Sequence, residues 1–180
     1  MKSIILMGMK HSGKSSLSRR LAWLWKIRSV DLDELIEGIY RPDRAVSCRE
    51  IYRQHGEEYF RGLEAQAAQK LANIASSEAV CASLGGGTIE NQKAMVSLKG
   101  AGLLVYLKAD ADELFSRIIH GGIPSYLKSD NPSEEFLALY DKRTPLYEKA
   151  SDMTISVNGM SLEDAFNTLT EKLKEHGYAG

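Results

Sequence analysis

The stretch Ile4-Ile5-Leu6-Met7-Gly8-Met9-Lys10-His11-Ser12-Gly13-Lys14-Ser15 joins a short apolar run to the start of a helical pattern. Its second part fits the template of a glycine, four residues, and then glycine, lysine and serine. Gly8 and Gly13 permit backbone torsions and close approach that a Cβ would forbid, so successive amides point into one concavity that suits an anion. Lys14 adds a mobile positive charge for the outer phosphates of a nucleotide, and the Ser15 hydroxyl is a ligand for Mg²⁺. The stretch therefore predicts a strand, a phosphate-binding loop and a helix.

Four further apolar runs follow, and helical patterns lie between them. Strands that alternate with helices are typical of a parallel sheet with right-handed crossovers and helices on both faces. The pattern therefore predicts a three-layer α/β/α fold around a five-stranded parallel sheet. The later strands are expected at about 29–33, 79–84, 102–107 and 153–157. The helices are expected at about 14–26, 34–70 with interruptions near 40–43 and at Gly56, 88–98, 110–119, 133–147 and from 161 onward, with caps at Ser133 and Ser161.

The composition fits a single domain over residues 1–180, because 43% of the chain is hydrophobic and 26% is charged. A formal net charge of −1 gives no global attraction to nucleic acid or to an anionic membrane, so we expect a small-molecule partner and a monomer. Cys48 and Cys81 lack a metal-binding or redox spacing and are expected to be free thiols in a reducing cytoplasm. The apolar run 4–7 is too short for a signal peptide or a membrane span, which favours a soluble, cytoplasmic protein.

Two carboxylates end the second predicted strand. Asp31 and Asp33 are separated by one residue, so on an extended segment both project to the same face. In parallel sheets, ligands bind at the carboxyl ends of the strands. From the residues alone, one acid would hold Mg²⁺ through water while the other accepts the proton of, or orients, an attacking hydroxyl. The alternative is an ordinary strand-end turn with two solvated acids.

Two arginines and a triple glycine are further candidates for a site. Arg61 and Arg143 come from distant helical segments, and converging guanidinium groups suit a carboxylate because their fork geometry makes bidentate bonds. Each hydrogen bond to a charged partner is worth about 1.5–3 kcal/mol, enough to select an acid over its neutral analogue. The alternative is two surface arginines paired with neighbours such as Glu64. The run 85–87 marks a position that needs bare backbone.

Two segments are expected to lie beside the sheet. The helical excursion 34–70 suggests a lobe that belongs to the same domain. The breaker cluster at 120–125 and the polar residues up to Pro132 suit a flap over 120–132, with its hinge at Gly121, Gly122 and Pro124. A site that transfers phosphate needs such closure to exclude water.

Taken together, the motifs resemble those of the shikimate kinases in order and spacing, from about residue 4 to residue 157. The resemblance implies a P-loop kinase fold and ATP-dependent phosphorylation of the 3-hydroxyl of shikimate, on the pathway to chorismate and aromatic amino acids. The matching motifs are the phosphate loop, Asp31-x-Asp33, Gly56-Glu57-x-x-Phe60-Arg61-x-x-Glu64, Leu84-Gly85-Gly86-Gly87-Thr88 and Arg143-x-Pro145-x-Tyr147.

The resemblance also implies roles for individual residues. Contacts to shikimate are expected from Asp33, Arg61, Gly85, Gly86, Gly87 and Arg143. Contacts to ATP are expected from Gly8, His11, Ser12, Gly13, Lys14, Ser15, Ser16 and the adenine-side Arg117. Ser15 and Asp31 are the expected magnesium residues, and Lys14, Asp33 and Arg117 the expected catalytic residues.

Two positions depart from the family pattern. The family's lid usually carries an Arg-Pro pair, where this chain has Ile123-Pro124, and an arginine supplied to the transition state of phosphoryl transfer is worth about 10³–10⁵ in rate. Lys10, Arg117 and Lys128 are the candidates to replace it. His11 stands where the family generally has glycine, either as a solvent-facing loop residue or in a catalytic role. Two alternatives therefore stay open: a related kinase with another hydroxy-acid acceptor, and a nucleotide- and ligand-binding module with low turnover.

Overall fold

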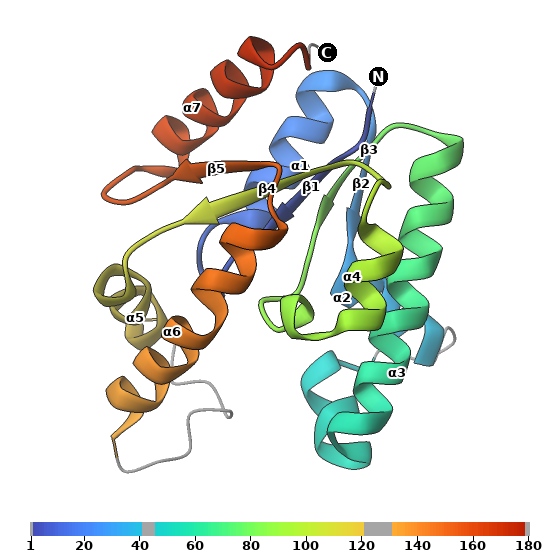
Figure 1. Cartoon of the computed structure of the whole chain (residues 1–180), viewed down its shortest axis with the longest axis vertical. Helices are drawn as coiled ribbons and strands as arrows, with labels where there is room; N and C mark the ends of the chain where they lie inside the picture. Colours follow the sequence, from blue (N-terminus) through green and yellow to red (C-terminus); the bar gives the residue numbers. More distant parts are fainter. Residues whose placement is uncertain (1, 41–45, 121–130, 179–180) are drawn as a thin grey trace.

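The computed structural model describes residues 2–40, 46–120 and 131–178, and its centre is a parallel sheet (Figure 1). The strand order is β2-β3-β1-β4-β5, so the strand that leads into the phosphate loop is the middle one. All four residues of this strand are buried, which explains its uninterrupted apolar sequence. The strands are β1 (Ile4–Met7), β2 (Arg28–Asp31), β3 (Val80–Ser83), β4 (Leu103–Lys108) and β5 (Met153–Ser156).

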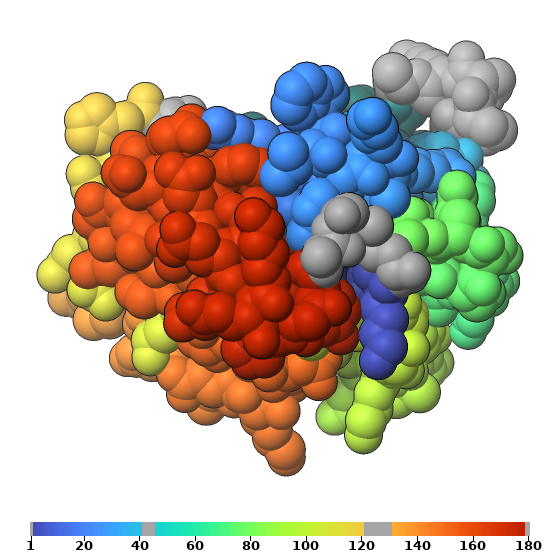
Figure 2. Space-filling view, turned by 90° about the horizontal axis from the view of Figure 1, so that it is seen from above, coloured from blue at the N-terminus to red at the C-terminus, as the bar shows by residue number. Residues whose placement is uncertain are grey.

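Helices connect the strands and pack on the sheet, which confirms the predicted α/β fold. The first helix packs on β1, β2 and β3 and also contacts the last helix that the structure describes. Figure 2 shows the surfaces of these two helices, blue and red, side by side. Between them, Arg20 Cζ lies 4.3 Å from the ring centroid of Phe166. The helices are α1 (Lys14–Trp25), α2 (Leu32–Tyr40), α3 (Cys48–Ser77), the 3-10 turn η1 (Thr88–Glu90), α4 (Gln92–Leu98), α5 (Ala111–His120), α6 (Pro132–Ala150) and α7 (Leu162–Glu175).

Three local expectations need correction. The segment after β2 is not extended as far as Asp33, because α2 begins at Leu32 and places Asp33 in its first turn. Helix α6 begins at Pro132 with Asn131 as the residue before it, so Ser133 does not cap the helix. The helical excursion extends to Ser77 and does not end at about residue 70, whereas the expected interruption at Gly56 is confirmed, because its φ of 81° breaks the helical conformation and kinks α3. Ser161 caps α7 as expected, its hydroxyl accepting from the amide of Asp164.

The lobe and the flap are only partly described. The expected lobe corresponds to α2 and α3, which pack against each other. The expected flap 120–132 lies mostly outside the described residues, and Ile123, Pro124 and Lys128 with it. Cys48 and Cys81 are free thiols. Among the residues that the structure describes, none of the helices combines the length and apolar character that crossing a membrane requires.

Candidate active site

The loop between β1 and α1 has the backbone conformation that the sequence predicts. Gly8 has φ 149°, and a Cβ there would lie 2.7 Å from the carbonyl oxygen of Leu107, so no other residue fits. Gly13 has φ 90° at the N-cap of α1 and directs the first amides of the helix into the loop. The Ser12 hydroxyl is buried inside this loop and has no hydrogen-bond partner among the described residues. Ser16 is exposed in the first turn of α1.

Lys14 is buried under this loop. Its Nζ donates a hydrogen bond to the backbone carbonyl of Met9 over 2.8 Å. Burial lowers the pKa of Lys14 to about 8, although the nearby carboxylates of Asp33 and Asp31 favour its charged form. The lysine is therefore an ammonium in a poorly solvated position, and a phosphate would stabilise its charge.

Asp31, at the end of β2, is fixed by three hydrogen bonds. Its Oδ2 accepts from the hydroxyls of Ser15, at 2.9 Å, and Ser83, at 2.8 Å, and its Oδ1 accepts from the amide of Asp33, at 3.0 Å. The last bond is an N-cap interaction that starts α2 directly after the strand. Ser15 and Asp31 therefore present oxygen atoms side by side next to the phosphate loop.

Asp33 projects from the first turn of α2 toward the loop after β3. A Cβ on Gly85 would lie 2.9 Å from Asp33 Oδ1, so the first glycine of the triple run makes room for this carboxyl group. Although Asp33 is exposed, partial desolvation of its carboxyl group by the surrounding protein, together with the negative charge of Asp31, raises the pKa of Asp33 to about 6, and the positive charge of Lys14 opposes this shift. Such a carboxylate can accept a proton near neutral pH.

The segment after β3 lies between α3 and α6 and receives side chains from both (Figure 1). Arg61 of α3 donates to the carbonyl of Gly87 over 2.8 Å, and Tyr147 of α6 donates to the carbonyl of Gly86. The glycine carbonyls therefore tie two distant helices to one loop at the carboxyl edge of the sheet.

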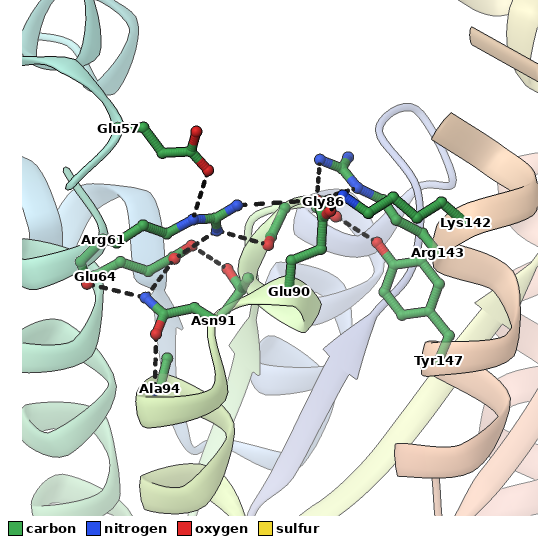
Figure 3. A network of polar contacts seen from close by, with 12 residues as sticks. Glu57, Arg61, Glu64, Gly86, Glu90, Asn91, Ala94, Lys142, Arg143 and Tyr147 are labelled. Atoms are coloured by element: carbon green, nitrogen blue, oxygen red, sulfur yellow. Dashed lines mark hydrogen bonds and ion pairs between the residues drawn. The ribbon is translucent and has the colours of Figure 1, made fainter. Parts of the chain in front are cut away.

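Arg61 is held on its own helix by a buried acid. Its NH1 lies 3.0 Å from Glu64 Oε2, and Glu64 also accepts from Thr88, at 2.7 Å, and from Asn91, at 2.8 Å (Figure 3). The alternative of a surface arginine paired with Glu64 is therefore only half right, because the pair exists but Glu64 is buried in a network of hydrogen bonds. The network orients the guanidinium toward α6.

Arg143 reaches the same place from α6, and Glu90 joins the two arginines. The Glu90 Oε2 atom lies 2.7 Å from Arg143 Nε, 2.6 Å from Arg143 NH2 and 3.8 Å from Arg61 NH2. Lys142 adds a third cation, with its Nζ 2.6 Å from Glu90 Oε1. Burial opposes ionisation, but Lys142 and Arg143 outweigh it and lower the pKa of Glu90, so the group is a carboxylate.

Arg117, at the other end of the site, connects α5 with the phosphate loop. Its NH1 donates to the carbonyl of His11 over 3.2 Å, and its NH2 pairs with Glu113. His11 is exposed and adopts a left-handed backbone conformation, with φ 66°, which is uncommon for a residue other than glycine. The His11 position thus adopts the geometry for which glycine is best suited.

A sequence model of the shikimate kinase family matches residues 10–174. The chain belongs to the shikimate kinase family. The shikimate kinase of Geobacter metallireducens is 33% identical over 96% of this chain and 92% of that protein, and one from Thermus thermophilus is 33% identical over 98% and 92%. The structure of Acinetobacter baumannii shikimate kinase in complex with shikimate has a TM-score of 0.85 and 25% identity, covering 99% of this chain and 96% of that one.

The family assignment confirms the prediction of an ATP-dependent kinase with a P-loop fold. The structure also brings together the residues that the shikimate kinase motifs single out: Asp33 lies beside Gly85, and Arg61 and Arg143 both surround Gly87. Sequence reasoning missed Glu90 and Lys142, which complete the charged cluster. Glu90 lies three residues after Gly87, at the end of η1. Its distance along the sequence from Arg143 gives no sign that the two residues form an ion pair.

The magnesium prediction can be tested against the donor atoms present. Ser15 and Asp31 supply a hydroxyl and a carboxylate, which are the hard oxygen ligands that Mg²⁺ prefers. Over residues 2–40, 46–120 and 131–178, no group of three or more His, Cys, Asp or Glu side chains is placed to hold a metal. The hydroxyl and the carboxylate fit an ion that is held by one or two protein oxygens together with substrate phosphates and water.

Proposed function

We propose that this chain transfers the γ-phosphate of MgATP to the 3-hydroxyl of shikimate and releases ADP and shikimate 3-phosphate. The observation that supports this acceptor is the convergence of Arg61 and Arg143 at Gly87, beside the phosphate loop. Two guanidinium groups favour a carboxylate, and shikimate is a cyclic carboxylic acid that carries hydroxyl groups. The structure of the related shikimate kinase from Acinetobacter baumannii is a complex with shikimate.

The nucleotide phosphates would lie in the loop between β1 and α1. There the amides near Gly13 and the ammonium of Lys14 face the anion, and Gly8, Ser12 and Ser16 belong to the same loop and first helical turn. Arg117 and His11 flank the nucleotide on the side of α5. Ser15 and Asp31 would hold Mg²⁺, which, when bound, neutralises charge on the transferring phosphates.

Asp33 is the proposed general base. It lies between Lys14 and the acceptor side of Gly85, and its pKa of about 6 leaves it ionised at neutral pH. When the acceptor hydroxyl attacks the γ-phosphorus, the O–P bond forms, the proton passes to the Asp33 carboxylate and the bond to ADP breaks. Arg61 and Arg143 orient the acceptor through its carboxylate, and orientation of this kind lowers the barrier by making the reaction effectively unimolecular.

The lobe at 34–70 and the flap at 120–132 are the segments proposed to enclose the acceptor and exclude water. A cytoplasmic monomer is the proposed working form. No nucleic-acid or membrane partner is proposed, since the net charge of −1 provides no general attraction to polyanions.

The deciding experiment measures ADP release from MgATP with a panel of acceptors: shikimate, its methyl ester, quinate and an uncharged polyol. The proposal expects ADP release that depends on shikimate, with one phosphate transferred per ADP and product phosphorylated at the 3-hydroxyl by ³¹P NMR. If ADP is released with another acceptor and not with shikimate, that acceptor and not shikimate is the substrate. Tight binding of shikimate and nucleotide with no ADP release above background would identify a binding module.

A further inference from the structure

The carboxylate of Glu90 occupies the space between the two arginines of the acceptor site (Figure 3). Glu90 ends the turn η1, whereas Arg61 belongs to α3 and Arg143 to α6, so three separate elements meet at this group. The Glu90 side chain is 13% exposed and that of Arg143 is 16% exposed, so the ion pair is poorly solvated. Its distances of 2.6 and 2.7 Å to Arg143 are those of a strong charge-assisted pair.

The other acids near the arginines have different positions. Glu64 is buried, and its oxygens also accept hydrogen bonds from Thr88 and Asn91, so its role is to hold α3 and the η1 segment together. Glu57 is 66% exposed and lies 3.6 Å from Arg61 Nε, on the outer side of the guanidinium. Of these three acids, only Glu90 pairs with both Arg61 and Arg143.

The charges within the cluster already balance. Arg61, Lys142 and Arg143 carry three positive charges, and Glu57, Glu64 and Glu90 carry three negative charges. A second carboxylate placed beside Glu90 would repel it, because like charges at such distances cannot both be ionised without a cost. An acceptor that presents a carboxylate to both arginines therefore has to move Glu90 away from them.

We propose that Glu90 is a specificity-determining residue, an internal carboxylate that competes with the acceptor's carboxylate for Arg61 and Arg143. The inference rests on the proposed function, because it assigns the two arginines to a carboxylate. Lys142 provides Glu90 with a partner after displacement, since its ammonium is bound to the other oxygen, Oε1, and its side chain is 67% exposed. Glu90 thereby weakens the binding of every acceptor that presents a carboxylate to the two arginines, so an acid must make further contacts through its hydroxyl groups to occupy the site.

The variant E90Q tests the competition because glutamine keeps the shape and removes the charge. Calorimetry with E90Q is expected to give a shikimate Kd about tenfold or more below that of the wild type, with an unchanged Kd for ATP. The methyl ester of shikimate, which has no carboxylate, is expected to bind both proteins equally. The matched control is E57Q, which removes the same charge from the exposed side of Arg61 and is expected to change the shikimate Kd by about twofold or less.

A second probe separates this inference from the proposed function. Cyclohex-1-ene-1-carboxylate carries the acid of shikimate without its hydroxyl groups, and E90Q is expected to bind it more tightly than the wild type does. If neither protein phosphorylates shikimate, the proposed function fails, while tighter binding of this probe by E90Q still supports the competition. If E90Q binds both carboxylates as weakly as the wild type or more weakly, Glu90 does not compete and instead orients the arginines, and the inference is overturned.

Discussion

The ammonium group of Lys14 donates a hydrogen bond to the carbonyl oxygen of Met9, 2.8 Å away in the same loop. The bond shows that the lysine lies along the concave side of the phosphate loop, under its backbone. Burial there lowers the pKa of Lys14 to about 8, so the charge of the loop depends on pH within the range in which kinases are assayed.

The affinity for ATP is expected to fall as the pH rises through about 8. Above this pKa the free enzyme loses the Lys14 proton, and the phosphates lose an ammonium partner. Measured between pH 7 and pH 9.5, the KM for ATP should rise by up to about tenfold per pH unit above pH 8. The variant K14R keeps its charge throughout, so its KM should not follow this trend, whatever its absolute value. A wild-type KM that is constant across this range would contradict the pKa assignment.

Acceptor turnover is expected to fall at acidic pH because Asp33 must be ionised to take the proton. With a pKa of about 6, kcat/KM for shikimate should decline tenfold per unit below pH 6. D33N should lower kcat by about 10²–10⁴ at pH 7.5. The control is E34Q on the same helix, because Glu34 is an exposed partner of Arg19. Equal losses in D33N and E34Q would remove Asp33 from the role of base.

D33N is also expected to be more stable than the wild type, which separates its role in chemistry from a role in folding. The pKa of Asp33 is about 6 in the folded protein and about 3.9 when unfolded, so ionisation destabilises the fold above pH 6. Thermal unfolding should show a higher Tm for D33N at pH 7.5, and the difference should shrink as the pH falls through 6 toward 4. A lower Tm for D33N at pH 7.5 would mean that the carboxylate supports the fold.

Shikimate binding is expected to depend on both arginines, and ATP binding on neither. R61A and R143A each remove bonds to a charged partner worth about 1.5–3 kcal/mol, which corresponds to about a tenfold to hundredfold rise in the shikimate Kd. R53A is the control, because Arg53 lies on the same helix and is 79% exposed. If R61A and R143A bind shikimate as well as R53A does, the acceptor lies elsewhere.

The phosphate loop and the sheet could be predicted because their signals are local. The glycines and lysine of the loop stand at fixed spacings, and the strand before it is apolar at all four positions because both faces of the sheet are covered. The alternation of residues 29–33 predicts Asp33 on a strand, whereas a capping signal at Asp31 predicts the helix start that the structure shows. Asp31 is followed three residues later by Glu34, a pattern typical of a helix start, and Asp31 indeed accepts the amide of Asp33.

The start of α6 was misplaced for a similar reason. Asn131 followed by Pro132 is a better helix entry than Ser133, because proline suits the first helical position. Glu90 could not be predicted at all, because its partners Arg61 and Arg143 lie on other elements and meet only after the crossovers form. Motif spacing identifies the residues that a ligand requires, but it does not identify a neighbour that competes with that ligand.

The order of the elements along the chain sets the order in which the ribosome makes the two parts of the site. The phosphate loop, Asp33 and Arg61 precede Arg143 in the sequence, so Arg143 is translated later. A nascent or truncated chain that stops before α6 lacks Arg143, one of the two arginines proposed to bind the acceptor's carboxylate. It also lacks β5. The site for the acceptor's carboxylate can therefore form only after the phosphate-binding loop has been synthesised.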